Sequence, residues 1–129
     1  MEAKAKAQAS QLFYEAVDKL NRAKEEYYKP EEDLMAYLVC KNAQFSIENF
    51  LRGYLLHNGV DPGENATMST LFEACKRINQ GFEQVDLTAL HCKNENVDTR
   101  FCNDAPRACN CLHVSTTLES FLRKENVIA

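Results

Sequence analysis

The N-terminal part of the chain carries one stripe of apolar side chains. They recur at steps of three and four residues: Leu12, Phe13, Ala16, Leu20, Ala23 and Tyr27. Charged residues fill most of the positions between them, so the pattern predicts an amphipathic helix over residues 3–28. Pro30 should separate this helix from the next, because the residue before a proline is pushed out of the α region.

The following stretch, residues 30–57, is much more apolar. Its large apolar side chains are Leu34, Leu38, Phe45, Ile47, Phe50, Leu51, Tyr54 and Leu55. So wide an apolar surface predicts a central helix that contacts its neighbours on several sides. Pro30 suits the first helical position, and Asn58-Gly59 supplies a left-handed C-terminal cap.

A third helix is predicted after the loop around Pro62. Thr67 or Ser69 can cap its beginning, and Gly81 should end it. A shorter helical piece is expected over residues 86–92.

The last helix should begin near Ala105 and run to about Lys124. Its buried stripe is predicted to consist of Ala108, Cys111, Ser115, Leu118 and Leu122. The sequence shows no alternating strand pattern, internal repeat or linker. These features predict a single all-α domain, residues 1–129, folded as an antiparallel up-and-down bundle of four to five helices.

Composition narrows the classes of function. The apolar fraction of 45% and the charged fraction of 26% are typical of a globular domain. The net charge is −4, and residues 30–90 carry most of the excess of acids. A protein that binds duplex DNA through its backbone needs a basic face, and no basic cluster is visible. We therefore expect no duplex DNA partner, whereas a short RNA or a nucleotide in a local pocket is compatible with the sequence.

The N-terminal residues and the longest apolar run indicate where the protein acts. Residues 1–9 are charged and alanine-rich, without the apolar core of a signal peptide. The longest apolar run, residues 35–40, is far shorter than the ~20 residues that span a bilayer. We expect a cytoplasmic protein with no membrane partner, whose six cysteines are reduced.

Cysteine and histidine cluster in the last third of the chain. The cluster consists of His91, Cys92, Cys102, Cys109, Cys111 and His113. Zinc prefers thiolate and imidazole ligands, but the cluster has no C-x₂-C pair. On a helix, Cys109 and Cys111 point about 200° apart, which does not suit one metal ion. We therefore predict packing residues with no metal and no cofactor, and we assign Cys40 and Cys75 to the core.

Residues 43–59 (AQFSIENFLRGYLLHNG) resemble the signature of the HEPN (higher eukaryotes and prokaryotes nucleotide-binding) domains. That signature has a small or aliphatic stretch, a Glu, then Leu and Lys, an aliphatic pair and a terminal Gly. In this chain Glu48 stands at the acid position, and Arg52 stands where a Lys is usual. The resemblance implies a small helical module that binds nucleotides.

Other segments extend the resemblance over essentially the whole chain. The first helix ends in a tyrosine-rich turn, and Arg100-Phe101 resembles an Arg-Tyr pair that precedes the last helix of the family. The third helix departs from the family, because residues 67–69 replace a His that is often found there. By resemblance, Glu48, Arg52 and Arg100 are nucleotide-binding or structural residues. The resemblance also implies a homodimer, and a nucleotidyltransferase as a frequent partner of such domains, as in toxin–antitoxin pairs.

Many HEPN domains are ribonucleases whose site is an Arg followed by a His after four to six residues. Arg107 and His113 have five residues between them, and Arg52 and His57 have four. A His base for the 2′-hydroxyl and an Arg for the charged phosphorane would suit RNA cleavage. On an ideal helix, however, positions 107 and 113 lie about 240° apart. Arg107 and His113 could meet only if the first turn of the helix were frayed, or if they came from different chains across a dimer interface.

Three functions are compatible with these patterns. The one we favour is a HEPN-like module that binds a nucleotide, an RNA or a partner protein without catalysis. The second is a metal-independent endoribonuclease of the toxin type that uses Arg107 and His113. The third is an oligomeric scaffold or a regulatory zinc protein that uses the cysteine and histidine cluster.

Overall fold

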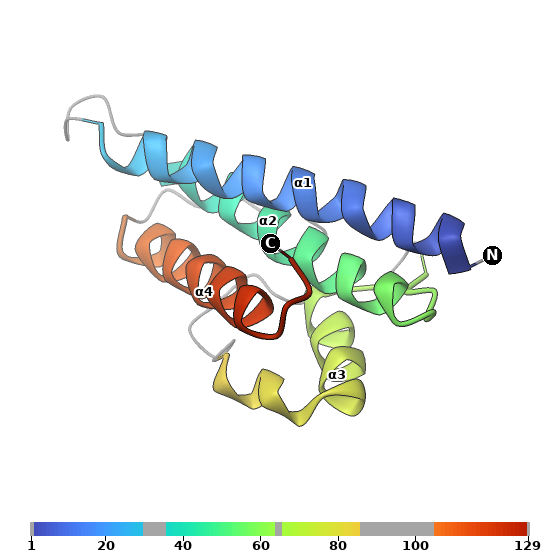
Figure 1. Ribbon diagram of the computed structural model, residues 1–129. Helices are drawn as coiled ribbons and strands as arrows, with labels where there is room; N and C mark the ends of the chain where they lie inside the picture. The colour runs from blue at the N-terminus through green and yellow to red at the C-terminus, as the bar shows by residue number, and fades with distance from the viewer. Residues whose placement is uncertain (1, 30–35, 64–65, 86–104, 129) are drawn as a thin grey trace.

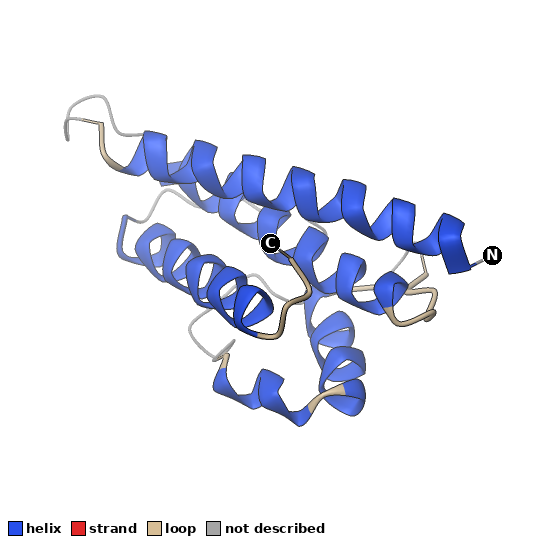
Figure 2. Cartoon of the chain, viewed as in Figure 1, coloured by secondary structure: helices blue, strands red, loops and turns tan. Residues whose placement is uncertain are grey.

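The computed structural model describes residues 2–29, 36–63, 66–85 and 105–128. Within these ranges the chain forms α1 (Glu2–Tyr27), α2 (Ala36–His57), α3 (Met68–Ile78), a 3₁₀ helix η1 (Gln80–Gln84) and α4 (Ala105–Lys124). The described residues contain no strand (Figure 2). The predicted all-α class is therefore confirmed.

The helix α2 lies at the centre of the molecule. Figure 1 shows α1 running antiparallel to it, with α4 beside it and α3 near its C-terminal end. Several α2 side chains have no exposed surface: Val39, Ala43, Ile47, Phe50 and Leu51. Buried side chains of all the described helices join these in one hydrophobic core. The apolar surface predicted for this helix is thus covered on more than one side.

The predicted stripe of α1 is largely buried, but with a shift at both ends. Phe13, Ala16, Leu20 and Ala23 belong to the core, as expected from the three- and four-residue spacing. Leu12 and Tyr27 are only half-buried, and Ala9 continues the buried face instead.

The end of α2 is capped as the sequence predicts. Gly59 adopts a left-handed backbone (φ +78°), and the Val60 amide donates to the Leu55 carbonyl oxygen at 2.8 Å. This is the bond that closes a Schellman cap. The helix ends at His57, as expected, whereas its predicted start at Pro30 lies outside the described residues.

The end of α3 differs from the prediction. A capping box between Thr67 and Thr70 begins the helix, but the helix ends at Ile78 rather than at Gly81. Asn79 is extended, and its side-chain oxygen accepts a hydrogen bond from the Gly81 amide to start η1. This turn places Phe82 fully inside the core. The predicted helical piece over residues 86–92 lies outside the described residues.

The helix α4 begins at Ala105 and ends at Lys124, as predicted. Its stripe is buried at Cys111, Ser115, Leu118 and Leu122, while the side chain of Ala108 lies outside the described part. In the portion of the chain that the structure describes, no helix has both the length and the apolar character needed to cross a membrane.

Candidate functional site

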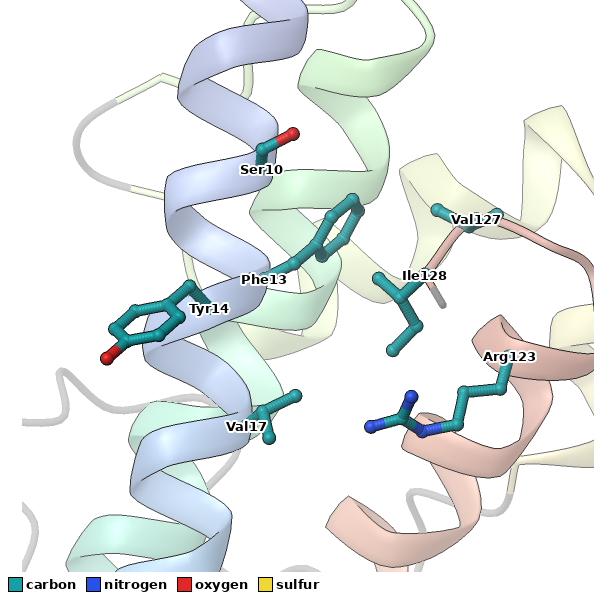
Figure 3. Close-up of a pocket in the computed structure, with 7 residues that line it drawn as sticks. All are labelled: Ser10, Phe13, Tyr14, Val17, Arg123, Val127 and Ile128. Carbon is teal, nitrogen blue, oxygen red and sulfur yellow. The ribbon is translucent and has the colours of Figure 1, made fainter.

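A shallow, open pocket lies between α1 and the C-terminal end of α4 (Figure 3). Its volume is about 360 Å³. It is lined by Ser10, Phe13, Tyr14, Val17, Arg123, Val127 and Ile128. The first four come from α1, Arg123 comes from the last turn of α4, and the last two come from the segment that follows it.

A left-handed turn after α4 brings this last segment into the pocket. Asn126 has a φ of 61°, and asparagine tolerates this conformation better than most residues. The Val127 amide donates to the Leu122 carbonyl oxygen at 3.0 Å, which closes the helix end. The chain therefore reverses, and Val127 and Ile128 face α1.

Phe13 forms the floor of the pocket because α2 approaches α1 closely there. The Phe13 side chain is buried, and a Cβ atom at Gly53 would lie only 2.6 Å from its Cε1 atom. Only glycine at position 53 leaves the ring where it is. The ring also lies 6.4 Å from the His57 ring, centroid to centroid. The floor of the pocket is thus fixed by packing, whereas the Tyr14 side chain is 71% exposed and points away from the pocket (Figure 3).

Arg123 is the charged member of the lining. Figure 3 shows its guanidinium group reaching across the opening toward Val17. Its Nη2 atom lies 3.0 Å from Glu119 Oε2, one turn earlier on α4. This ion pair orients the group, and a guanidinium has five N–H donors with which to bind further acceptors. A pocket with apolar walls and one cation at its edge suits a ligand with a flat apolar part and an anionic part.

Arg52, which the sequence offers as a nucleotide-binding or structural residue, holds a loop. Its Nη1 atom donates to the Gly63 carbonyl oxygen at 2.7 Å, and its Nη2 atom donates to the Ala66 carbonyl oxygen at 3.4 Å. The side chain therefore connects α2 to the loop before α3. Glu48, one turn earlier on α2, is half-buried. Arg100 lies outside the described residues.

The two predicted Arg-His pairs differ in how much of them the structure describes. The helix α4 is continuous from Ala105, so positions 107 and 113 lie about 240° apart around it. His113 is exposed, and the side chain of Arg107 lies outside the described part. In the other pair, Arg52 is held by the loop and His57 packs beside Phe13.

The predicted cysteine and histidine cluster is mostly outside the described residues. His91, Cys92 and Cys102 fall there, as does the side chain of Cys109. Of the remaining members, Cys111 is buried and His113 is exposed. Among the described residues, no group of three His, Cys, Asp or Glu side chains is placed to hold a metal ion.

The interior holds a polar cluster that the sequence patterns did not reveal. The Sγ atoms of Cys40 on α2 and Cys111 on α4 lie 3.5 Å apart, although 71 positions separate them. Nearby, Ser115 Oγ donates to Ser46 Oγ at 2.9 Å, which in turn donates to the Ala16 carbonyl oxygen at 2.7 Å. Sequence proximity grouped Cys111 with the cysteines near it in the chain. Cys40 and Cys111 each lie on the buried apolar face of their helix, and this is the sequence signal that could have paired them.

The third buried thiol, Cys75, stands in a different environment. It donates to the Leu51 carbonyl oxygen, with an Sγ to oxygen distance of 3.5 Å. Burial raises the pKa of the Cys75 thiol to about 12, because a thiolate would lose its hydration there. Cys75 is therefore an unreactive core residue. A scan against models of protein families, a search of curated proteins and a search of solved structures give no match for this chain.

Proposed function

We propose that this chain is a HEPN-type helical module that binds a nucleotide in the pocket between α1 and α4, without catalysis. One observation carries the proposal: the Arg123 guanidinium reaches over a pocket whose walls are otherwise mainly apolar. Guanidinium binds phosphate oxygens through two parallel hydrogen bonds, which is a common basis of phosphate recognition.

The dimensions and lining of the pocket suit a mononucleotide. Ligand pockets of roughly 300–1,000 Å³ are typical, and this one measures about 360 Å³. The base would lie against Phe13, Val17 and Ile128, and the phosphate would accept hydrogen bonds from Arg123.

The residues that line the pocket favour binding without catalysis at this site. None of its seven lining residues is a His, Asp or Glu, so none could serve as a general base near neutral pH. Arg52 is occupied by the loop carbonyl groups, and Arg107 and His113 do not share a face of α4. These observations favour binding over RNA cleavage.

Calorimetric titration with the four ribonucleoside monophosphates would test the proposal. We expect wild type to bind at least one of them, and Arg123→Gln to weaken that binding about tenfold or more, since hydrogen bonds to charged groups contribute about 1.5–3 kcal/mol. Arg77→Gln is the matched control, because Arg77 is exposed at the end of α3, away from the pocket lining. Absence of binding by wild type, or equal losses in both variants, would contradict the proposal.

The same proposal includes a symmetric homodimer, in line with the family resemblance, and a nucleotidyltransferase as the partner protein in a cytoplasmic toxin–antitoxin pair. Tyr28, at the end of α1, is 77% exposed and offers an aromatic contact at such an interface. Light scattering should give twice the 14.7 kDa mass of one chain at micromolar concentration. A mass of 14.7 kDa would count against the dimer.

A metal-independent ribonuclease is the second candidate, favoured by the exposure of His113 on α4. Its site would require Arg107 and His113 to meet across a dimer interface. In that case, RNA cleavage by wild type should fall about 10²–10⁴-fold in His113→Ala and be unchanged in His57→Ala. Equal cleavage by wild type and His113→Ala would eliminate this candidate.

A further inference from the structure

Two cysteines meet in the interior, where α2 and α4 lie side by side (Figure 1). The Sγ atoms of Cys40 and Cys111 are 3.5 Å apart and are not joined by a disulfide. Both side chains are buried. A disulfide requires a sulfur–sulfur distance of about 2.05 Å, so the two atoms would need to approach by only about 1.5 Å.

A buried amide group faces this pair of thiols. Gln44 lies one turn after Cys40 on α2, and its Nε2 atom donates to Cys40 Sγ at 2.6 Å and to Cys111 Sγ at 3.8 Å. Its Oε1 atom is buried without a hydrogen-bond partner among the described residues. An amide placed so in a core is costly if packing is its only role. An N–H donor directed at sulfur stabilises the negative charge that a thiol acquires when it ionises, and the thiolate is the reactive form.

Cys75 shows what a buried cysteine in this fold looks like without such surroundings. Its hydrogen-bond partner is the Leu51 carbonyl oxygen, an acceptor, which stabilises the thiol rather than the thiolate. Burial alone therefore does not make a thiol of this protein reactive. The pair formed by Cys40 and Cys111 differs from Cys75 in having a second sulfur and an amide donor within reach.

We propose that Cys40 and Cys111 form a site of reversible oxidation, at which hydrogen peroxide converts the two thiols into a disulfide between α2 and α4. The Cys40 thiolate attacks one oxygen of the peroxide, the O–O bond breaks, and the departing hydroxide takes up a proton to become water. The resulting sulfenic acid is attacked by Cys111, so the S–S bond forms, the S–O bond breaks and a second water leaves. Two electrons pass from the thiols to one peroxide molecule.

A peroxide molecule is small enough to reach the pair during a local opening of the helices. Once formed, the disulfide closes a loop that contains most of α2, all of α3 and η1, and the first turns of α4. Closing a loop of this length restricts the unfolded chain and stabilises the fold. A small thiol reductant would reverse the reaction by thiol–disulfide exchange. The site is independent of the nucleotide pocket.

The test uses the full chain with Cys92, Cys102 and Cys109 replaced by serine, which leaves three thiols. After treatment with hydrogen peroxide and removal of the excess with catalase, thiols are counted in denaturant and the link is mapped by peptide mass spectrometry. We expect one free thiol, a Cys40–Cys111 link that dithiothreitol reverses, and a melting temperature raised by about 5 °C or more. Peptide mapping of peroxide-treated wild type should show the same link.

Three further variants in this background distinguish the pair from an unspecific reaction. Cys111→Ala should abolish the link, while Cys75→Ala should leave it intact; circular dichroism confirms that each variant is folded. Gln44→Leu should slow formation of the link severalfold, because it removes the N–H donor. Three free thiols after oxidation, a link that involves Cys75, or separate sulfinic acids at Cys40 and Cys111 would overturn the proposal.

Discussion

The interior around α2 and the pocket between α1 and α4 distribute polar and apolar groups in opposite ways. In the interior, the hydroxyl groups of Ser46 and Ser115 are buried and hydrogen-bonded to each other and to the Ala16 carbonyl oxygen, so three helices are joined by two small side chains. In the pocket, apolar side chains such as Val17 and Ile128 are only half-buried, and the charged Arg123 lies at the edge.

The difference shows which region specifies the fold and which is available to a ligand. A buried hydroxyl costs free energy unless it finds its partner, so the serine pair is satisfied in one register of α1, α2 and α4. The apolar lining of the pocket still has surface that a ligand can remove from water. We therefore expect substitutions in the interior to change stability and substitutions in the pocket to change binding.

The largest expected effect is at Phe82, in the interior. Its ring lies 4.7 Å from the Tyr54 ring and 4.8 Å from the Phe121 ring, centroid to centroid, and it has no exposed surface. Phe82→Ala should lower the free energy of unfolding by about 3–5 kcal/mol, because it leaves a cavity among aromatic rings. Urea denaturation would measure it. Tyr14→Ala, at an exposed position of α1, is the control and should change stability by about 0.5 kcal/mol or less.

The burial of Phe82 is also a feature that the hydrophobic periodicity of the sequence does not predict. The periodic stripes of α1, α2 and α4 predict helices and their buried faces well, because three- and four-residue spacing maps directly onto a helical surface. Phe82 lies just after Gly81, the residue at which the third helix is predicted to end. Its burial depends on the Asn79 side chain capping a new turn, a local hydrogen bond that hydrophobic periodicity does not report.

The candidate sites were harder to predict than the fold. The thiol pair joins residues 71 positions apart, so the sequence alone indicates only that Cys40 and Cys111 each lie on a buried face. The pocket depends on a left-handed Asn126 that folds Val127 and Ile128 back toward α1. Neither feature follows from spacing along the chain, because both arise from the way separate helices are placed against one another.

The second prediction concerns alkaline pH and Cys75. Its pKa is raised from 9.0 to about 12 in the folded protein, so the unfolded chain loses this proton first as the pH rises. The thiol therefore contributes its full stability below pH 9, and stability is lost between pH 9 and pH 12, by roughly 1.4 kcal/mol per pH unit. Urea denaturation from pH 8 to pH 11 should show a steeper decline for wild type than for Cys75→Ala. Parallel declines would contradict it.

The third prediction tests the buried serine pair. Ser46→Ala should destabilise the fold by about 1–3 kcal/mol, because the Ser115 hydroxyl loses its acceptor in a buried place. The double variant Ser46→Ala/Ser115→Ala should be no less stable than Ser46→Ala alone, since it removes both polar groups. Chemical denaturation of the two single variants and the double variant gives the coupling free energy. Additive losses would show that the pair does not act as a unit.

The smallest effect on stability is expected at the pocket, from Arg123→Gln. The ion pair with Glu119 is of the i,i+4 kind on a helix, and the Arg123 side chain is 43% exposed, so the pair should contribute about 0.3–0.5 kcal/mol.

Glu119→Gln breaks the same ion pair and is the matched variant. If the ion pair only stabilises α4, the two variants should be indistinguishable. If Arg123 binds phosphate, Arg123→Gln should lose nucleotide binding while Glu119→Gln keeps or strengthens it, because the guanidinium is released from its carboxylate. Calorimetric titration beside urea denaturation would separate these outcomes, and loss of binding in both variants would remove Arg123 from the ligand site.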